Sequence, residues 1–204
     1  MKKIVSMVVI LIIMASVSTV LAADKQENEA EAQIAALTKA IAGHPQDVQN
    51  YVNRGKIYAS RNQTALALAD YNRAITLDPN NLLAYTARAQ AFGTAKQYEA
   101  ALADYSKVIE ISPGDINARF QSGVCHYYRG EYELGIGDLE QVIVMQPAHA
   151  GAYLVKAVCL QKLERNDEAV AAYKSLLINV PEGKESQEAI GMAKKMLKRL
   201  GAEL

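Results

Sequence analysis

Large and small apolar residues alternate along residues 48–181 in the pattern of paired amphipathic helices. The chain can be divided into repeats of 34 residues that begin at Val48, Leu82, Ile116 and Ala150, with each first residue numbered position 1. In each repeat a first segment carries large residues at positions 4 and 11 and a small one at position 8. A second segment carries a small residue at position 20 and bulky ones at positions 24, 27 and 28. Spacings of three, four and seven residues place side chains on one helix face. Each repeat therefore predicts two helices that pack through such faces, joined by a turn near residues 60–63, 129–131 and 164–166.

The prolines follow the same period. The chain has five of them, each 34 residues after the last: Pro45, Pro79, Pro113, Pro147 and Pro181. Proline lacks an N–H group and disfavours helical geometry in the residue before it, so it ends helices. The second helix of each pair is therefore expected to stop just before its proline.

The small positions are the most regular part of the pattern. Position 8 holds Gly or Ala, as does position 20: Gly55, Ala89, Gly123 and Ala157, then Ala67, Ala101, Gly135 and Ala169. Together with aromatic residues at positions 4 and 24 and proline at 32, this pattern resembles the tetratricopeptide repeat, a 34-residue helix–turn–helix unit. The resemblance covers residues 48–181, and the third unit departs most, with Arg119, His126 and Leu139 at positions that are usually aromatic.

The resemblance implies an all-α fold, a right-handed α-solenoid of four 34-residue repeats (48–81, 82–115, 116–149 and 150–183). Stacked repeats need polar caps at their ends. Residues 24–47 are expected to form an acidic leader and an N-terminal capping half-repeat, with core residues Ile34, Leu37, Ala40 and Ile41. Residues 184–204 are expected to form a C-terminal capping helix with a basic outer face; attachment of that face to an anionic membrane is the alternative.

Residues 1–23 have the layout of a secretory signal peptide. Lys2 and Lys3 precede an apolar run over residues 4–14, and small residues end it at Ala22 and Ala23. Such a segment is normally cleaved after the small residues. The alternative is an uncleaved membrane anchor over residues 4–20, which lies at the lower length limit of a membrane span. We expect export across the inner membrane to the periplasm or beyond.

Composition narrows the function further. The 22 basic and 22 acidic residues cancel, and no basic excess indicates nucleic-acid binding. No spacing of Cys and His matches a zinc site, and no phosphate-binding glycine loop or nucleophile motif occurs. We therefore expect no metal, no cofactor and no enzymatic activity. The expected partner is a protein or a peptide, with membrane contact only through residues 4–20, if retained, or through the basic C-terminal helix.

Charged residues recur inside the repeat. Position 7 holds Arg54, Arg88 and Lys156, and position 23 holds Asp70, Asp104 and Asp138. These predict ion pairs between the two helices of a repeat: Arg54 with Asp70, and Arg88 with Asp104 or Asp70. Lys156 has no acid at position 23 of its own repeat and is expected to pair with Asp138.

The two cysteines, Cys125 and Cys159, both occupy position 10. Equivalent residues on packed helices lie about 8–10 Å apart, whereas a disulfide needs Cα atoms within about 7 Å. We therefore predict two free, buried thiols. A thiol or metal enzyme using them with His126 is the rival interpretation.

Nine of the 11 tyrosines occupy positions 4, 11, 17 or 24, which build the scaffold. The exceptions, Tyr127 and Tyr128, fall with Phe120 at positions that line the concave groove in this family. Val124 lies one turn from Phe120 and Tyr128, and Leu154 and Val158 hold corresponding positions in the next repeat. These residues predict an apolar partner-binding pocket; the alternative is that Phe120 replaces the missing core aromatic at position 4.

The N-terminal half of the groove is expected to be more polar, with Lys56 and Gln90 as candidate contacts. The residues with which some family members bind a partner's C-terminal carboxylate are not present at the matching positions, so no such clamp is expected. The sequence thus predicts a binding scaffold, such as an envelope assembly factor, either released or membrane-tethered.

The mass of the purified protein tests the signal-peptide prediction. We expect the mature chain to begin after Ala22 or Ala23, because small residues there suit cleavage. Intact-mass spectrometry of protein from the cell envelope measures this directly. A mass that retains residues 1–23 would contradict cleavage and favour the tethered scaffold.

Overall fold

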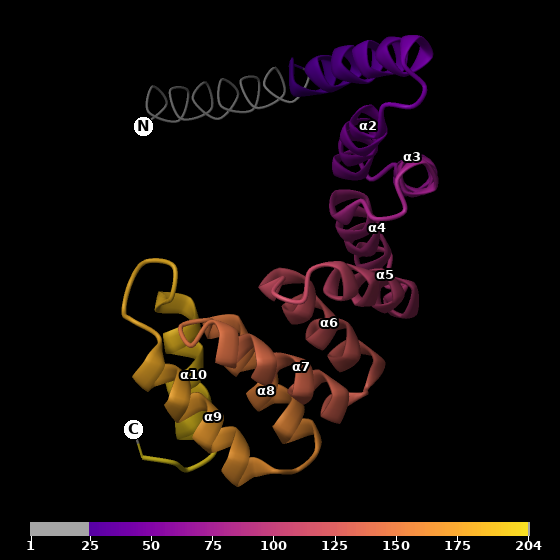
Figure 1. Cartoon of the computed structure of the whole chain (residues 1–204). Helices are drawn as coiled ribbons and strands as arrows, with labels where there is room; N and C mark the ends of the chain where they lie inside the picture. The colour runs from indigo at the N-terminus through magenta and orange to yellow at the C-terminus, as the bar shows by residue number, and fades with distance from the viewer. Residues whose placement is uncertain (1–24, 204) are drawn as a thin grey trace, which may run out of the picture. The chain divides into compact units, whose positions relative to one another are not determined.

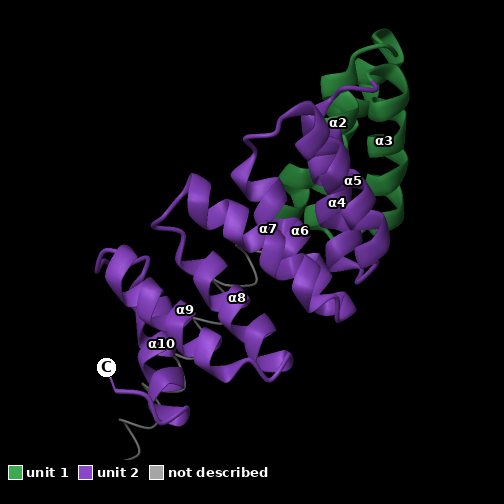
Figure 2. Ribbon diagram, turned by 60° about the horizontal axis from the view of Figure 1, so that its bottom comes forward, with its two compact units in different colours: residues 1–78 green, residues 79–204 purple. Residues whose placement is uncertain are grey.

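The computed structural model describes residues 25–203, and all regular secondary structure in that range is helical (Figure 1). The expected signal peptide lies outside the described residues. The chain divides into two compact units, residues 1–78 and residues 79–204, coloured separately in Figure 2. Each unit is described by itself.

The described part of the first unit contains a helix over residues 25–43, followed by α2 (Val48–Ser60) and α3 (Thr64–Leu77). Along residues 25–43 the half-buried side chains include Ile34, Leu37, Ala40 and Ile41, the four core residues expected of an N-terminal cap. Arg61 reaches Glu27 at 2.8 Å, and Arg54 donates to Thr38 at 3.0 Å, so polar contacts attach this helix to its own unit.

The second unit holds three further helical pairs and a final helix. The pairs are α4 (Leu82–Thr94) with α5 (Tyr98–Ile111), α6 (Ile116–Arg129) with α7 (Tyr132–Met145), and α8 (Ala150–Lys162) with α9 (Asn166–Asn179). The final helix, α10 (Gln187–Arg199), buries Ile190, Ala193 and Leu197 against α9 and α8. Its lysines and Arg199 are exposed, as expected of a cap.

The start of each first helix has a clear local cause. The residue two places after each of the first four prolines caps the helix that follows, because its side chain accepts a hydrogen bond from a backbone N–H of the first turn. Asp47, Asn81 and Asp115 do so with oxygen atoms at 2.8–3.0 Å, and His149 does so with Nδ1 at 3.1 Å. Proline thus ends one helix while its neighbour begins the next.

The turn inside each pair is equally regular. Position 15 adopts a left-handed backbone in all four pairs: Asn62, Lys96, Gly130 and Glu164. In the first pair the N–H of Gln63 then bonds the carbonyl of Tyr58 at 2.9 Å, and that of Asn62 bonds Ala59 at 3.0 Å. This is the Schellman arrangement, which satisfies the last carbonyls of a helix. Only Gly130 adopts this conformation without strain from a side chain.

Burial confirms the helix faces predicted from the sequence. The residues at position 20 that carry a side chain are 0% exposed, and those at position 24 are at most 2% exposed. Position 27 is fully buried throughout: Ala74, Val108, Val142 and Leu176. At position 11 only Leu160 is fully enclosed, while Tyr58, Phe92 and His126 are half-buried.

The helices of a pair approach closely at the small residues. A methyl group added to Gly55 would lie 2.5 Å from a ring carbon of Tyr71. In the third pair, a methyl group on Gly135 would lie 3.0 Å from the backbone oxygen of Gly123. The two glycines bring α6 and α7 together backbone to backbone, and Leu139 rather than a tyrosine fills the space beside them.

Two of the expected ion pairs form with two hydrogen bonds each. Arg54 meets Asp70 at 2.8 and 2.7 Å, and Arg88 meets Asp104 at the same distances. The Asp70 hydrogen bond raises the pKa of Arg54, and the Asp104 hydrogen bond raises that of Arg88. Both aspartates are buried, so loss of one arginine would leave an uncompensated charge, which is costly.

The expected pairing of Lys156 with Asp138 is wrong. Lys156 instead bonds Glu140 at 2.7 Å. Glu140 lies two residues after Asp138, and two residues turn a helix by about 200°. Asp138 therefore faces α6, where Arg119 lies at 3.6 Å and His126 at 4.0 Å. Glu140 faces α8 and receives the lysine.

No helix within residues 25–203 has the combination of length and apolar character that a membrane crossing requires.

The glycine contact predicts a contrast between two substitutions on α7. Gly135→Ala should destabilise the protein, because the added methyl group meets backbone, and overpacking costs about 1–3 kcal/mol. Alanine is more favourable than glycine inside a helix by up to about 1 kcal/mol, which offsets part of this destabilisation. Thermal or urea unfolding of the purified protein measures the difference.

Gly137→Ala is the matched control, because a methyl group at Gly137 meets nothing within 4 Å. It should leave stability unchanged or raise it by up to about 1 kcal/mol through propensity alone. Equal effects of the two substitutions would show that α6 and α7 do not meet at Gly135.

Candidate functional site

The residues expected to bind a partner lie mainly on α6 and α8, and we call this surface the α6 face. It comprises Phe120, Val124, Tyr127 and Tyr128 of α6 with Leu154 and Val158 of α8. Tyr128 is 59% exposed, and the other five are half-buried. Helices α6 and α8 are in contact, so both contribute to one side of the second unit.

The tyrosines of the α6 face belong to a larger aromatic group. Tyr128 stacks on Tyr98 of α5 with ring centroids 5.0 Å apart and planes 8° apart. Tyr127 meets Tyr128 edge-on at 5.2 Å and Tyr132 of α7 at 6.0 Å. Stacking of this kind holds rings in place even where solvent reaches them. Tyr98 and Tyr132 both occupy repeat position 17, a scaffold position, so the repeat pattern gave no sign that they extend this aromatic group.

Ion pairs beside these aromatic residues fix the C-terminal end of α6. Arg129 bonds Glu131 at 2.9 Å and lies 3.5 Å from Glu99, beside Tyr98. His126 bonds Glu131 at 2.7 Å. These contacts, with the His126 bond the largest, lower the pKa of Glu131. His126 is therefore engaged in a structural contact rather than directed at a free site.

Phe120 packs at the opposite end of α6. Its ring centroid lies 4.6 Å from that of His149, and Gly151 leaves room for its edge. It contacts the apolar core of the C-terminal helices while remaining half-buried. Phe120 and Tyr128 are eight residues apart, about 12 Å along the helix. The structure thus places two aromatic contact points along α6, with Val124 between them.

The two polar candidates are both exposed. Lys56 lies on α2 in the first unit, and Gln90 lies on α4 in the second. Their role in binding stays a prediction.

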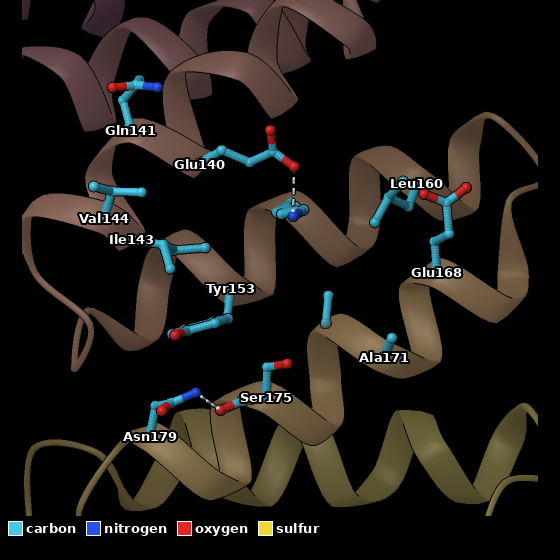
Figure 3. A pocket seen from close by; sticks show the side chains of 12 residues that line it. Glu140, Gln141, Ile143, Val144, Tyr153, Leu160, Glu168, Ala171, Ser175 and Asn179 are labelled. Carbon is cyan, nitrogen blue, oxygen red and sulfur yellow. Dashed lines mark hydrogen bonds and ion pairs between the residues drawn. The ribbon is translucent and has the colours of Figure 1, made fainter.

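A groove that the sequence pattern did not predict lies on other helices. It runs between α7 and α9 with α8 as its floor, and it encloses about 550 Å³ (Figure 3). Its apolar lining includes Tyr153 and Leu160 of α8 and Ala172 of α9. We call this site the outer groove. The only sequence signal was the absence of charged residues from repeat positions 22, 26 and 29 of α7 and α9.

The cysteines are free and buried, as predicted. Burial raises the pKa of each thiol, Cys125 and Cys159, to about 11. A reactive cysteine needs an exposed thiolate, so neither is suited to nucleophilic or redox chemistry. Within residues 25–203, no group of His, Cys, Asp and Glu is arranged to hold a metal ion.

Comparisons with known proteins agree with the repeat pattern. The family described as "TPR repeat" matches residues 55–96, and the family described as "Anaphase-promoting complex, cyclosome, subunit 3" matches residues 94–176. No curated protein sequence matched this chain.

Solved structures share the fold. The chain matches a crystal structure of MamA with a TM-score of 0.71 and 21% identity, over 76% of this chain and 91% of that one. MamA from Desulfovibrio magneticus RS-1 matches with a TM-score of 0.71 and 17% identity, over 79% and 89% of the two chains. The chain is thus built of tetratricopeptide-type repeats, and such a repeat scaffold is consistent with a role in protein interaction.

Thiol labelling tests the environment of the cysteines. With a pKa of about 11, on the order of one thiol in a thousand is ionised at pH 8, against roughly one in four for an ordinary cysteine. We expect iodoacetamide to label the folded protein very slowly at this pH and the urea-unfolded protein at the ordinary rate. Rapid labelling of the folded protein would show that the thiols are accessible and ionised, and would favour the rival interpretation of a thiol enzyme.

Proposed function

We propose that the protein is an exported, non-enzymatic scaffold that binds a protein or peptide through the α6 face. In this role it would act as an assembly or docking factor in the cell envelope. The observation that carries the proposal is Tyr128, a large aromatic side chain that is 59% exposed yet stacked on Tyr98 in a defined position.

Exposed, pre-oriented tyrosines are suited to recognition. A tyrosine supplies a large contact area and a polar tip, and few bonds must be frozen on binding. The neighbouring half-buried residues, Val124, Tyr127, Leu154 and Val158, add apolar area on the same side. Tyr127 and Leu154 also pack against the apolar core, but none of the four occupies one of the buried scaffold positions 8, 20, 24 or 27, so each leaves part of its side chain for a partner.

The chemistry of the described residues favours binding over catalysis. The thiols are buried with raised pKa values. His126 and His149 are each held by a structural hydrogen bond, to Glu131 and to the backbone N–H of Ala152. The aromatic and apolar side chains that the α6 face exposes are suited to binding, so a non-enzymatic role is the simplest function for them.

The location rests on the sequence of residues 1–23. Their basic start, apolar run and small-residue end favour export with cleavage, which would release the repeats into the periplasm or medium. Retention of residues 4–20 would instead give a membrane-tethered scaffold that organises an envelope complex. The same α6 face would serve in either case.

Site-specific photo-crosslinking tests the α6 face. A photoreactive phenylalanine at position 128 should join the protein to one discrete partner in envelope extracts, because the side chain there faces the bound segment. We expect the crosslinked band to disappear when the protein also carries Tyr127→Ala, provided that this variant retains wild-type helicity and melting temperature. Denaturing gels followed by mass spectrometry identify the partner.

Leu83 is the control position, since it is 51% exposed in the same unit but belongs to α4. The photoreactive residue there should yield no discrete band. The same bands from positions 128 and 83 would show non-specific contact and overturn the proposed site.

A further inference from the structure

The outward positions of the second helices differ between the early and the late repeats. Positions 22, 26 and 29 include charged residues on α3 and α5: Ala69, Arg73 and Thr76, then Ala103, Lys107 and Glu110. On α7 and α9 the same positions are uncharged: Gly137, Gln141 and Val144, then Ala171, Ser175 and Ile178. A helix surface that faces only water has no physical reason to exclude charge. The change coincides with the outer groove.

The groove exists because the interhelical ion pair is absent from the last repeat. In the second repeat, Arg88 and Asp104 fill the space between their helices. In the last repeat Ala172 stands at the aspartate position, and Lys156 turns away to Glu140 of α7. The small side chains of Ala171, Ala172 and Ser175 then line a hollow together with Tyr153 and Leu160. Figure 3 shows Ala171 and Ser175 on α9 across from Tyr153 and Leu160 on α8.

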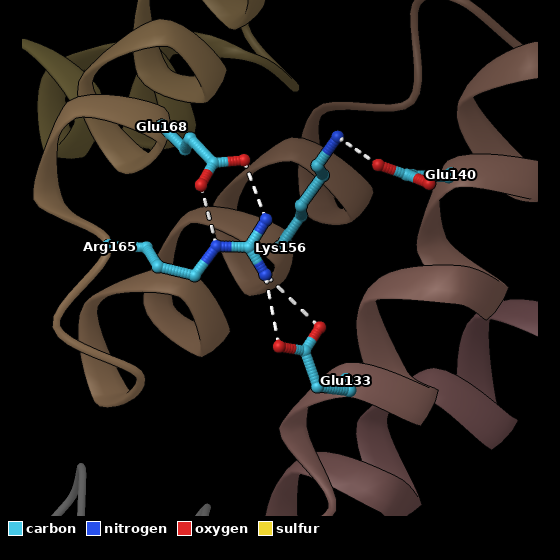
Figure 4. Close-up of polar contacts among 5 residues, drawn as sticks. All are labelled: Glu133, Glu140, Lys156, Arg165 and Glu168. Carbon is cyan, nitrogen blue, oxygen red and sulfur yellow. Dashed lines mark hydrogen bonds and ion pairs between the residues drawn. The ribbon is translucent and has the colours of Figure 1, made fainter.

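One end of the outer groove is acidic. Arg165 lies between two carboxylates, bonding Glu168 at 2.6 Å and Glu133 at 3.0 Å (Figure 4). Lys156 is already paired with Glu140. Three carboxylates thus meet two cations, which leaves one negative charge in excess. The carboxylate side chains remain 53–65% exposed, so a further cation can reach them.

The other end carries exposed aliphatic side chains. Val144 of α7 lines the groove there and is 73% exposed. Ile178 of α9 lies one helical turn after the lining residue Ser175 and is 80% exposed. Ile178 is the most exposed of the large apolar side chains in the described residues. Single exposed aliphatic residues are common, but two at equivalent positions beside an apolar groove indicate a contact surface.

We propose that the outer groove binds an amphipathic helix of a partner protein, with aliphatic residues at one end and Lys or Arg at the other. A groove between two helices accepts a third helix through residues spaced three and four apart. Glu168 and Ile178 are ten residues apart on α9, about 15 Å along its axis. The bound helix therefore carries its basic residues roughly ten positions from its aliphatic anchor.

The charge balance selects this occupant. The excess negative charge favours a basic partner and disfavours an acidic one. The chain's own basic helix, α10, already buries its aliphatic stripe against α9 and α8. It therefore cannot offer that stripe to a second copy without leaving its own unit. The occupant is thus a separate basic helix.

A synthetic helical peptide tests the proposal. The probe is a fluorescent peptide of about 18 residues with leucines in the first two turns and two lysines roughly ten positions later. We expect saturable binding to the purified mature protein, measured by anisotropy. The Val144→Ser, Ile178→Ser double variant should bind at least about tenfold more weakly, a loss of about 1.4 kcal/mol. Glu168→Gln should weaken binding about threefold at low salt, and this effect should be smaller at high salt because salt screens the charge interaction.

The matched control is Leu66→Ser, Leu83→Ser, which removes two leucines that are 50% and 51% exposed elsewhere on the protein. It should bind the peptide as wild type does, and a peptide with glutamates in place of lysines should bind at least about tenfold more weakly. Equal binding by the Val144→Ser, Ile178→Ser variant would overturn the proposal. So would a wild-type protein that sediments as an oligomer and becomes monomeric in that variant, because a second copy would then cover the groove.

The outer groove and the α6 face can be separated experimentally. Tyr128→Ala should leave peptide binding unchanged, and the Val144→Ser, Ile178→Ser variant should leave crosslinking at position 128 unchanged. Failure of one proposal therefore does not decide the other.

Discussion

The close approach of two helices at small residues is the constraint on which the rest of this structure depends. Position 8 of the first helix and position 20 of the second must be Gly or Ala, because a larger side chain would push the backbones apart. Where both are glycine, at Gly123 and Gly135, the backbones themselves are in contact. The tyrosines at position 24, and Leu139 in their place, then fill the space beside the contact. Each repeat thus buries its core by the same packing rule.

That rule leaves most outward residues free to vary, so departures from the repeat carry the information about function. In the third repeat, Arg119 pairs with Asp138 at position 23. In the first and second repeats an arginine at position 7 pairs with the aspartate at position 23. Position 7 is then free to hold the buried Ser122. The first helix of this repeat also carries the two tyrosines that the scaffold does not use. In the fourth repeat, loss of the aspartate opens the outer groove. Both candidate surfaces arise where the repeats depart from their own pattern.

The two surfaces differ in chemistry. The α6 face is aromatic and is held by ring stacking, with charged side chains at its margin. The outer groove is aliphatic at one end and acidic at the other. A scaffold with two such surfaces could hold two different segments at once, which is how repeat proteins bring partners together. Neither surface requires the repeats to change their packing.

The sequence by itself determined the helical pairs, their turns and the buried faces. These features depend on local rules: a 34-residue period, proline at helix ends, and helical spacing of apolar residues. It also predicted the pairing of Arg54 with Asp70, because both lie at regular positions. Only the tertiary structure decided the partner of Lys156, the stacking of Tyr128 on Tyr98, and the existence of the outer groove. Each of these depends on which way a side chain points from one helix toward another, and periodicity alone does not specify that direction.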